Sequence, residues 1–439
     1  MMDIKLTSKD AMLTGLPLKP WRFAEGLIFV LLVLGFGIQA AADTTRPAAG
    51  ARHHSPARHT GVTPAALAPY YATLQGYEAE GPYHQNASEV LHGLGLELQK
   101  HGQHTKALKA LRRAMHINRV NSGLNSLSQA PMLRSIINSQ KNLLRFEPVT
   151  SSYNQLLRMH TATYGKHDPR IAPLLNELAL WHLDAYRFDE KSNRIDHLTS
   201  AYSLVTSALE LSETRSSPEP REQIGLLRSA ALINFHLSRH EGDEWSASTN
   251  SHYSLSADGF ATANPQRTGI LSGASFRRGR VCHERIMALT AAIPEVSLEE
   301  KLQAQAELAD WYLVFNHRAE AMAHYQQVLA QIVASDQPTE LHAKLFSTPR
   351  LLPAMRMENH HSTGSTLFMT ADVDISEKGW GSQIENIGDT LFPGQRPPSN
   401  NSLHYMMVDT IKGSRFRPQF VDNKAAEVSN VAVKIPLLH

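Results

Sequence analysis

The chain has 439 residues, of which 42% are hydrophobic, and its 43 lysines and arginines nearly balance its 41 aspartates and glutamates. This length allows two or three domains, because domains typically run to about 100–200 residues. The hydrophobic content argues against a disordered chain, and the near-neutral charge argues against a nucleic-acid partner, which would select a basic surface. The single cysteine, Cys282, excludes an internal disulfide.

Residues 1–42 have the pattern of an export signal. Basic residues precede an almost uninterrupted apolar stretch from Gly26 to Ala42, which ends in three alanines before Asp43. A basic start, an apolar middle and a small-residue cleavage site predict a signal peptide that is removed after Ala42. The alternative is an uncleaved membrane anchor, because the apolar stretch approaches the roughly 20 residues that span a bilayer.

Residues 43–66 are rich in alanine, proline, histidine and arginine and show no apolar periodicity. Such a segment cannot bury enough surface to offset the loss of chain entropy on folding. It is therefore expected to be a flexible linker.

Two distant segments share one pattern of small and apolar residues, with successive offsets of 3, 4, 5, 4 and 3. The matched residues are Gly95, Leu98, Gly102, Ala107, Leu111 and Ala114 in the first segment, and Ala309, Tyr312, Asn316, Ala321, Tyr325 and Val328 in the second. Small residues at these spacings let the two helices of a hairpin cross closely, with a larger side chain beside them. The pattern resembles the tetratricopeptide repeat, a helix-turn-helix unit that stacks on its neighbours.

Less regular helices are predicted between these two segments, among them one over 223–240 and one over 275–292. We expect an irregular α-solenoid of hairpins resembling tetratricopeptide repeats over residues 67–335. Most of its apolar side chains are expected to pack in the core. The inner face of the stacked helices would form a groove for a peptide or a partner protein.

Strand character begins near Thr366, where apolar and polar residues alternate up to Ile375. This alternation predicts a half-buried strand, with Asp372 and Asp374 on its solvated face. A second strand at 382–388, a helix at 403–413 and a last strand at 431–435 complete the order β-β-α-β. Residues 360–439 are therefore expected to form a separate small α+β domain.

The strand order, the hairpin "DISEKGWGSQIENI" and the run "RFRP" at 415–418 resemble the carboxy-terminal domain of TonB-type energy transducers. The resemblance implies binding rather than chemistry, because such domains engage outer-membrane receptors by adding a peptide strand to a sheet edge. The candidate partner-binding residues are Arg415, Arg417, Val431, Val433 and Ile435. Phe416 and Phe420 are expected to bury against the helix, and the two arginines to flank its end.

The chain departs from a transducer because a short linker and a repeat body stand in place of a long proline-rich spacer. Force transmission from the inner membrane is therefore not expected.

Residue patterns give no catalytic, cofactor or metal site. The sequence has no nucleophile elbow, phosphate-binding loop or paired-cysteine motif. Its 23 histidines are scattered rather than set at metal-ligand spacing. The run from Cys282 to Arg285 is an unpromising nucleophile, because adjacent helical residues point about 100° apart and do not face each other. No cofactor is expected.

These patterns predict a non-enzymatic exported scaffold that binds protein partners in the periplasm, with envelope or outer-membrane proteins as candidates. One alternative is a membrane-anchored accessory of a TonB-type transport system, in contact with the membrane only through its N-terminal segment. Another is a cell-envelope enzyme without a recognisable motif.

Overall fold

A computed structural model describes residues 64–189, 194–217, 219–240, 274–353, 368–389, 408 and 410–436. The predicted export signal at 1–42 and most of the predicted linker lie outside these residues. The described chain is mostly helical, with a small sheet region at its C-terminal end, as the sequence predicts at this level.

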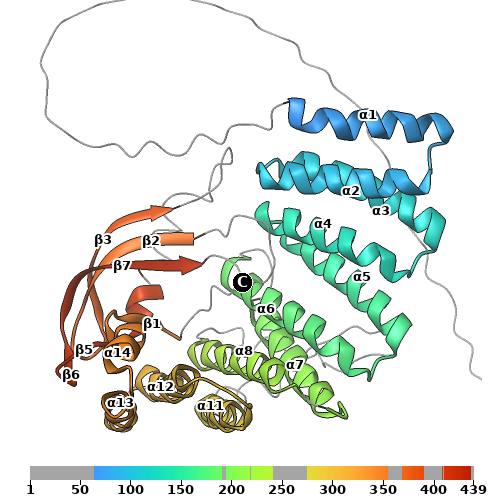
Figure 1. Ribbon diagram of the computed structural model, residues 1–439. Helices are drawn as coiled ribbons and strands as arrows, with labels where there is room; N and C mark the ends of the chain where they lie inside the picture. Colours follow the sequence, from blue (N-terminus) through green and yellow to red (C-terminus); the bar gives the residue numbers. More distant parts are fainter. Residues whose placement is uncertain are drawn as a thin grey trace, which may run out of the picture. The chain divides into compact units, whose positions relative to one another are not determined.

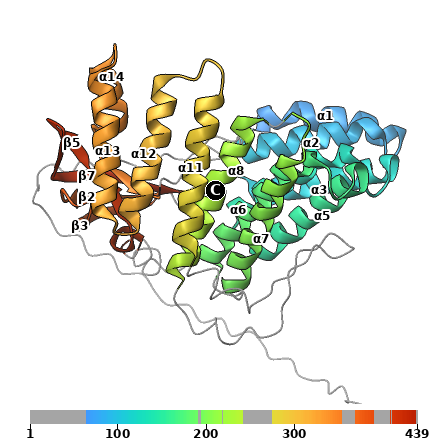
Figure 2. The ribbon, with the colours of Figure 1, turned by 90° about the horizontal axis from the view of Figure 1, so that it is seen from below.

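The helices follow one another from Pro64 to Phe346 (Figures 1 and 2). They are α1 (Pro64–Glu80), α2 (Gln85–Lys100), α3 (His104–Ser122), α4 (Ala130–Asn142), α5 (Phe146–Tyr164), α6 (Ala172–Phe188), α7 (Arg194–Glu213), α8 (Pro220–Arg239), α11 (Ser275–Ala292), α12 (Leu298–Val314), α13 (Arg318–Val333) and α14 (Pro338–Phe346). Short 3-10 turns at Leu127–Gln129 and Pro169–Ile171 precede α4 and α6. Consecutive helices pack in pairs, namely α2 with α3, α4 with α5, α6 with α7, α8 with α11, and α12 with α13.

Small residues let the paired helices approach closely. A Cβ added to Gly95 of α2 would lie 2.5 Å from a side-chain carbon of Leu111 on α3, closer than real Cβ atoms come. Leu111 is fully buried, and side chains in a close-packed interior can shift little. Gly279 of α11 meets Trp311 of α12 in the same way, at 1.9 Å. The prediction that Gly95 lies at a close helix crossing is confirmed.

The turns inside three of the pairs share one geometry. Gly102, Leu144 and Asn316 all have positive φ, at 69°, 49° and 65°. In each turn the next residue donates its backbone N–H to a carbonyl five residues back, as in the Schellman motif that ends many helices. Gly102 and Asn316 are equivalent positions in the two matched segments, so the spacing read from the sequence extends to the backbone of the turn.

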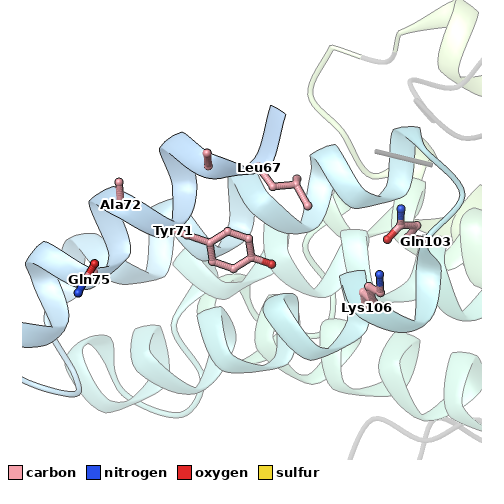
Figure 3. Close-up of a pocket in the computed structure, with 7 residues that line it drawn as sticks. Leu67, Tyr71, Ala72, Gln75, Gln103 and Lys106 are labelled. Atoms are coloured by element: carbon pink, nitrogen blue, oxygen red, sulfur yellow. The ribbon is translucent and has the colours of Figure 1, made fainter. Parts of the chain in front are cut away.

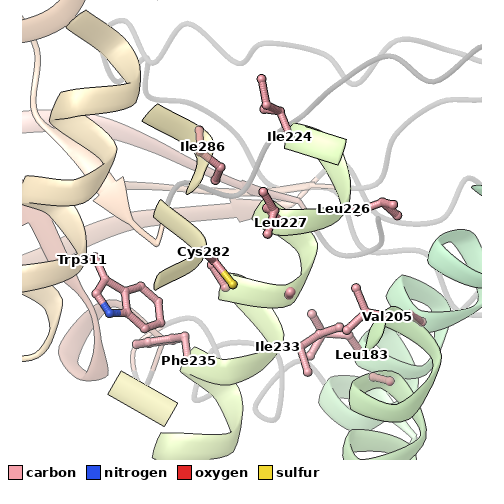
Figure 4. Close-up of a cluster of buried hydrophobic side chains, with 14 of the residues drawn as sticks. Leu183, Val205, Ile224, Leu226, Leu227, Ile233, Phe235, Cys282, Ile286 and Trp311 are labelled. Atoms are coloured by element: carbon pink, nitrogen blue, oxygen red, sulfur yellow. The ribbon is translucent and has the colours of Figure 1, made fainter. Parts of the chain in front are cut away.

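A large apolar core runs through these helices and extends from α4 to α14. Figure 4 shows part of it, with buried side chains contributed by α6, α7, α8, α11 and α12. Trp181, Leu183, Ile233 and Ile286 are at or near zero exposure in this core. A separate cluster joins α1 to α4.

The C-terminal strands are short and form three small sheets. They are β1 (Arg350–Leu352), β2 (Phe368–Ile375), β3 (Gly381–Asp389), β4 (Arg415–Arg417), β5 (Gln419–Val421), β6 (Lys424–Ala426) and β7 (Val428–Pro436). The main sheet has the order β3-β2-β7 and is antiparallel throughout, while β1 pairs with β4 and β5 pairs with β6. Strands β2, β3 and β7 match the predicted ones, whereas the sequence analysis missed β1 and the run β4–β6.

The predicted alternation is present in β2. Met369, Ala371, Val373 and Ile375 are all at most 2% exposed and form the core of the main sheet. On the opposite face, the Asp374 carboxylate accepts the backbone N–H of Asn430 at 2.8 Å, where β7 bulges and φ is 58°. Of the predicted helix at 403–413, the structure describes 408 and 410–413, which are helical and end at Gly413 as predicted.

The close crossing at Gly95 gives the first testable prediction. Gly95→Ala should destabilise the chain by about 1–3 kcal/mol, because its methyl group overpacks against a buried leucine. Gly225→Ala in α8 is the matched control, since nothing lies within 4 Å of a Cβ there. The control should be neutral or gain up to about 1 kcal/mol of helix propensity. Urea unfolding followed by circular dichroism measures both, and equal effects at the two glycines would contradict the crossing geometry.

Candidate functional site

The two arginines of the run at 415–418, which were expected to flank a helix end, lie in a strand. Arg415–Arg417 is strand β4, which pairs antiparallel with β1 just after α14, in the register Arg350 to Arg417 and Leu352 to Arg415. This pairing brings the predicted candidate residues against the last helices of the helical region. The described residues, from 64 to 436, belong to one compact unit by their contacts.

Arg417 lies in a buried ion pair with Asp310 of α12. Its Nε and Nη2 donate to the two carboxylate oxygens of Asp310 at 2.8 and 2.6 Å, and its Nη1 donates to the Leu345 carbonyl at 3.1 Å. The Tyr325 hydroxyl donates to the same carboxylate at 2.6 Å. The side chains of Arg417 and Asp310 are only 1% and 9% exposed. This bidentate geometry is the strongest form of the arginine–carboxylate contact.

Burial and the Asp310 carboxylate strongly shift the protonation equilibria of Arg417 and Tyr325. Burial alone would lower the pKa of Arg417, but the Asp310 carboxylate outweighs burial and raises this pKa above its usual range. Burial, together with Asp310, raises the pKa of Tyr325 well above its usual value. Arg417 is thus held as a cation, and its charge is balanced by the Asp310 carboxylate inside the protein. No partner can reach its guanidinium in this state.

Phe416 of the run and Phe420 just after it pack in different cores. Phe416 packs in the core of the main sheet with Ile411 of the short helix, as predicted. Phe420 instead enters the helical core, with its ring 5.5 Å from that of Tyr325 and 5.0 Å from that of Phe346. The prediction that Phe420 packs on the 403–413 helix is wrong, because this ring packs on α13 and α14. At the same interface, Gln326 donates to the Asn423 carbonyl at 2.9 Å.

Arg415 lies at the other end of β4 and is 8% exposed. Its guanidinium lies under the ring of Trp380, which belongs to the β2–β3 turn, and its Nη2 donates to the side-chain oxygen of Asn316. The turn itself is tied to β4, because the Phe416 backbone N–H donates to the Gly379 carbonyl at 2.8 Å. Arg415 therefore joins the α12–α13 turn to the β2–β3 turn of the main sheet.

The apolar candidates on β7 face inward. Val433 and Ile435 are 6% and 3% exposed, and Val431 packs partly buried against the same core. Ala432, between them, is exposed. Within the described residues β7 pairs only with β2, so no described strand lies along its other edge. A partner would meet the backbone of β7 rather than these side chains.

The first helices of successive pairs are linked by polar contacts. His92 of α2 hydrogen-bonds Ser135 of α4 at 3.0 Å, and Arg134 of α4 pairs with Glu177 of α6. Further along, two salt bridges link α8 to α12, Arg221–Glu300 at 2.7 Å and Arg228–Glu307 at 2.9 Å. We call the surface formed by α2, α4, α6, α8 and α12 the inner helix face. Three ion pairs cross this face between helices of the set.

A shallow pocket of about 570 Å³ lies where α1 meets the start of α3 (Figure 3). Its lining residues are Leu67, Ala68, Tyr71, Ala72, Gln75, Gln103 and Lys106. Figure 3 shows Tyr71 reaching from α1 across the space toward the side of Gln103 and Lys106. The lining brings together one cation, amides and a phenol, without a nucleophile or a carboxylate.

Burial shifts the pKa of titratable groups elsewhere in the chain, among them Cys282 and His182. Burial raises the pKa of the Cys282 thiol to about 11, so this cysteine is a protonated packing residue near neutral pH. The His182 and His197 rings approach at 2.9 Å between their Nδ1 atoms. Burial and then His197 lower the pKa of His182 to about 3, which keeps it neutral. No cluster of three potential ligands for a metal ion occurs in the part of the chain that the structure describes.

The Arg417–Asp310 pair gives the second prediction. Arg417→Gln should destabilise the chain by about 3–5 kcal/mol, because it leaves the Asp310 carboxylate buried without its cation. Arg221→Gln is the matched control, since this exposed pair should contribute no more than about 1 kcal/mol. Urea unfolding monitored by circular dichroism compares the two variants. A similar small loss in both would show that the buried pair does not hold the strand to the helices.

Two further findings bear on the kind of protein. Across the described residues, none of the helices combines the length and apolarity needed to traverse a bilayer. No protein-family model and no curated protein matches the chain.

Proposed function

We propose that the chain is a non-enzymatic scaffold or adaptor that binds partner proteins in the periplasm. The helix pairs would form an irregular solenoid resembling tetratricopeptide repeats, and the C-terminal strands a domain similar to the TonB carboxy terminus. The two binding surfaces are the inner helix face and the outer edge of β7.

The arrangement of β7 is the observation that carries the proposal. Its apolar side chains Val433 and Ile435 anchor the strand to the core, while its backbone on one edge lacks a strand partner among the described residues. An extended peptide can add to such an edge through main-chain hydrogen bonds, with little demand on its sequence. The strand is thus anchored by its side chains and offers its backbone for binding.

The inner helix face supports a second contact. Consecutive helix pairs place α2, α4, α6, α8 and α12 at repeated positions along the chain. Polar side chains link α2 to α4, α4 to α6, and α8 to α12. Repeated helices of this kind present extended surfaces suited to peptides and partner proteins. Binding there would require a partner that competes with or extends the existing ion pairs.

Export follows from residues 1–42, which lie outside the described structure. The apolar stretch from Gly26 to Ala42 also favours a second candidate, a membrane-anchored accessory of a TonB-type transport system. The two candidates share the binding surfaces and differ in whether the segment is removed.

Site-specific crosslinking tests the edge of β7. A photoreactive amino acid at Ala432 should capture a protein partner in the intact envelope, because a strand added beside β7 would lie within its reach. The same residue at Val281 of α11, which is 42% exposed, is the control and should not give that adduct. Electrophoresis and mass spectrometry identify the product. No adduct at Ala432, or an identical one at Val281, would contradict binding at this edge.

The mature N-terminus separates the two candidates. Mass spectrometry of the protein recovered from cells should find a start at Asp43 if the segment is a signal peptide. Replacing Ala40 and Ala42 by leucine should then block removal, because cleavage needs small residues there. Recovery of an unprocessed chain in the membrane fraction would favour the anchored accessory instead.

A further inference from the structure

The guanidinium of Arg415 is buried without its full set of acceptors. Its Nη2 donates to Asn316, but Nε and Nη1 have no hydrogen-bond partner and are closed off from solvent. Arg417, two residues along the same strand, has acceptors for Nε and both terminal nitrogens. Buried donors without acceptors are costly, so the environment of Arg415 is incomplete where that of Arg417 is complete.

The charges nearest to Arg415 have the same sign. Burial, then Arg239 and then Arg318 lower the pKa of Arg415 to about 10. Arg239 is held beside the α12–α13 turn by donating to the Val314 carbonyl at 2.9 Å, and Arg318 is the first residue of α13. Glu320, the acidic residue nearest to Arg318 in sequence, has its Oε1 3.9 Å from Nδ1 of His317. The described part of the chain therefore gathers three arginines here without a carboxylate that offsets them.

The outer part of this cluster is accessible. Arg239 and Arg318 are exposed, and Trp380, which covers Arg415, is 45% exposed. The first turn of α13 adds the positive end of a helix dipole beside Arg318. Arginine and tryptophan are also the residues that most often dominate the binding energy of protein interfaces.

We infer that Arg239, Arg318 and Arg415, together with Trp380, form a binding site for a carboxylate side chain of an acidic peptide in a partner protein. Movement of Trp380 would open the unpartnered donors of Arg415 to the carboxylate, which can accept a bidentate contact. The exposed indole face offers an apolar surface that a peptide can use and a small inorganic anion cannot. This site lies at the junction of α8, α13 and β4, apart from the edge of β7, and it deepens the proposed function by naming the chemistry of one partner.

Titration of the purified full chain tests the site directly. The probe is a blocked peptide of alternating glutamate and leucine, compared with its glutamine analogue and with inorganic phosphate. The peptide should bind at least about tenfold more tightly than either comparison, and the affinity should fall as salt rises. Binding should change the tryptophan fluorescence, and Trp380→Phe should abolish this change.

Two double variants with the same change in net charge are compared, one at the site and one away from it as the control. Arg239→Gln with Arg318→Gln should weaken peptide binding about tenfold or more, and because both side chains are exposed the fold should be kept. Arg112→Gln with Arg277→Gln removes two exposed arginines from α3 and α11 and should leave the affinity unchanged. Equal affinity of the two double variants would overturn the site.

Binding of the glutamine analogue with the same affinity would also overturn the site, and equal binding of phosphate would overturn its assignment to a peptide. These titrations need no crosslinking partner, so they can fail while the edge of β7 still binds, and the reverse.

Discussion

The Arg417–Asp310 ion pair is the interaction on which the C-terminal part of this chain depends. It joins residues 107 positions apart, and both side chains are almost completely buried. Removing two charges from water is expensive, and their attraction offsets this cost only where the remaining donors and acceptors are also satisfied. Here Tyr325 and the Leu345 carbonyl satisfy them. The pair is therefore sensitive to geometry, and a displacement of β4 would leave charges buried and unpaired.

This sensitivity fixes the register of the neighbouring strands. Strand β4 has only three residues and pairs with an equally short β1, so backbone hydrogen bonds alone specify its position weakly. A shift by one residue would turn Arg417 away from Asp310 and move Phe416 out of the sheet core. The ion pair and the two phenylalanines therefore select one register together. That register also places Trp380 and Arg415 beside the α12–α13 turn.

Sequence patterns predicted the features that depend on local spacing. The alternation in β2 correctly predicted which of its side chains are buried, and the small residues Gly95 and Ala107 correctly predicted a close helix pair. In β7 the alternation was predicted, but Val433 and Ile435, offered as partner-binding residues, are buried. The patterns did not predict β1 or β4, because three-residue strands are too short to show a period. They also could not assign the function of Arg417, since an arginine gives no sign in sequence of a carboxylate that lies far along the chain. Only the fold brings Asp310 to it.

The last helix pair differs from its matched counterpart at the positions that meet β4. Asp310 and Tyr325 take the places of Leu96 and Leu111, and Asn316 takes the place of Gly102. Each change keeps what the hairpin needs, since tyrosine still fills the groove and asparagine still adopts a positive φ. Each also adds an oxygen that bonds within the interface, to Arg417, to Asp310 or to Arg415. The hairpin geometry is thus retained, while the polar atoms of Asp310, Tyr325 and Asn316 hold the residues of a strand. This is how a helical chain can end in a sheet.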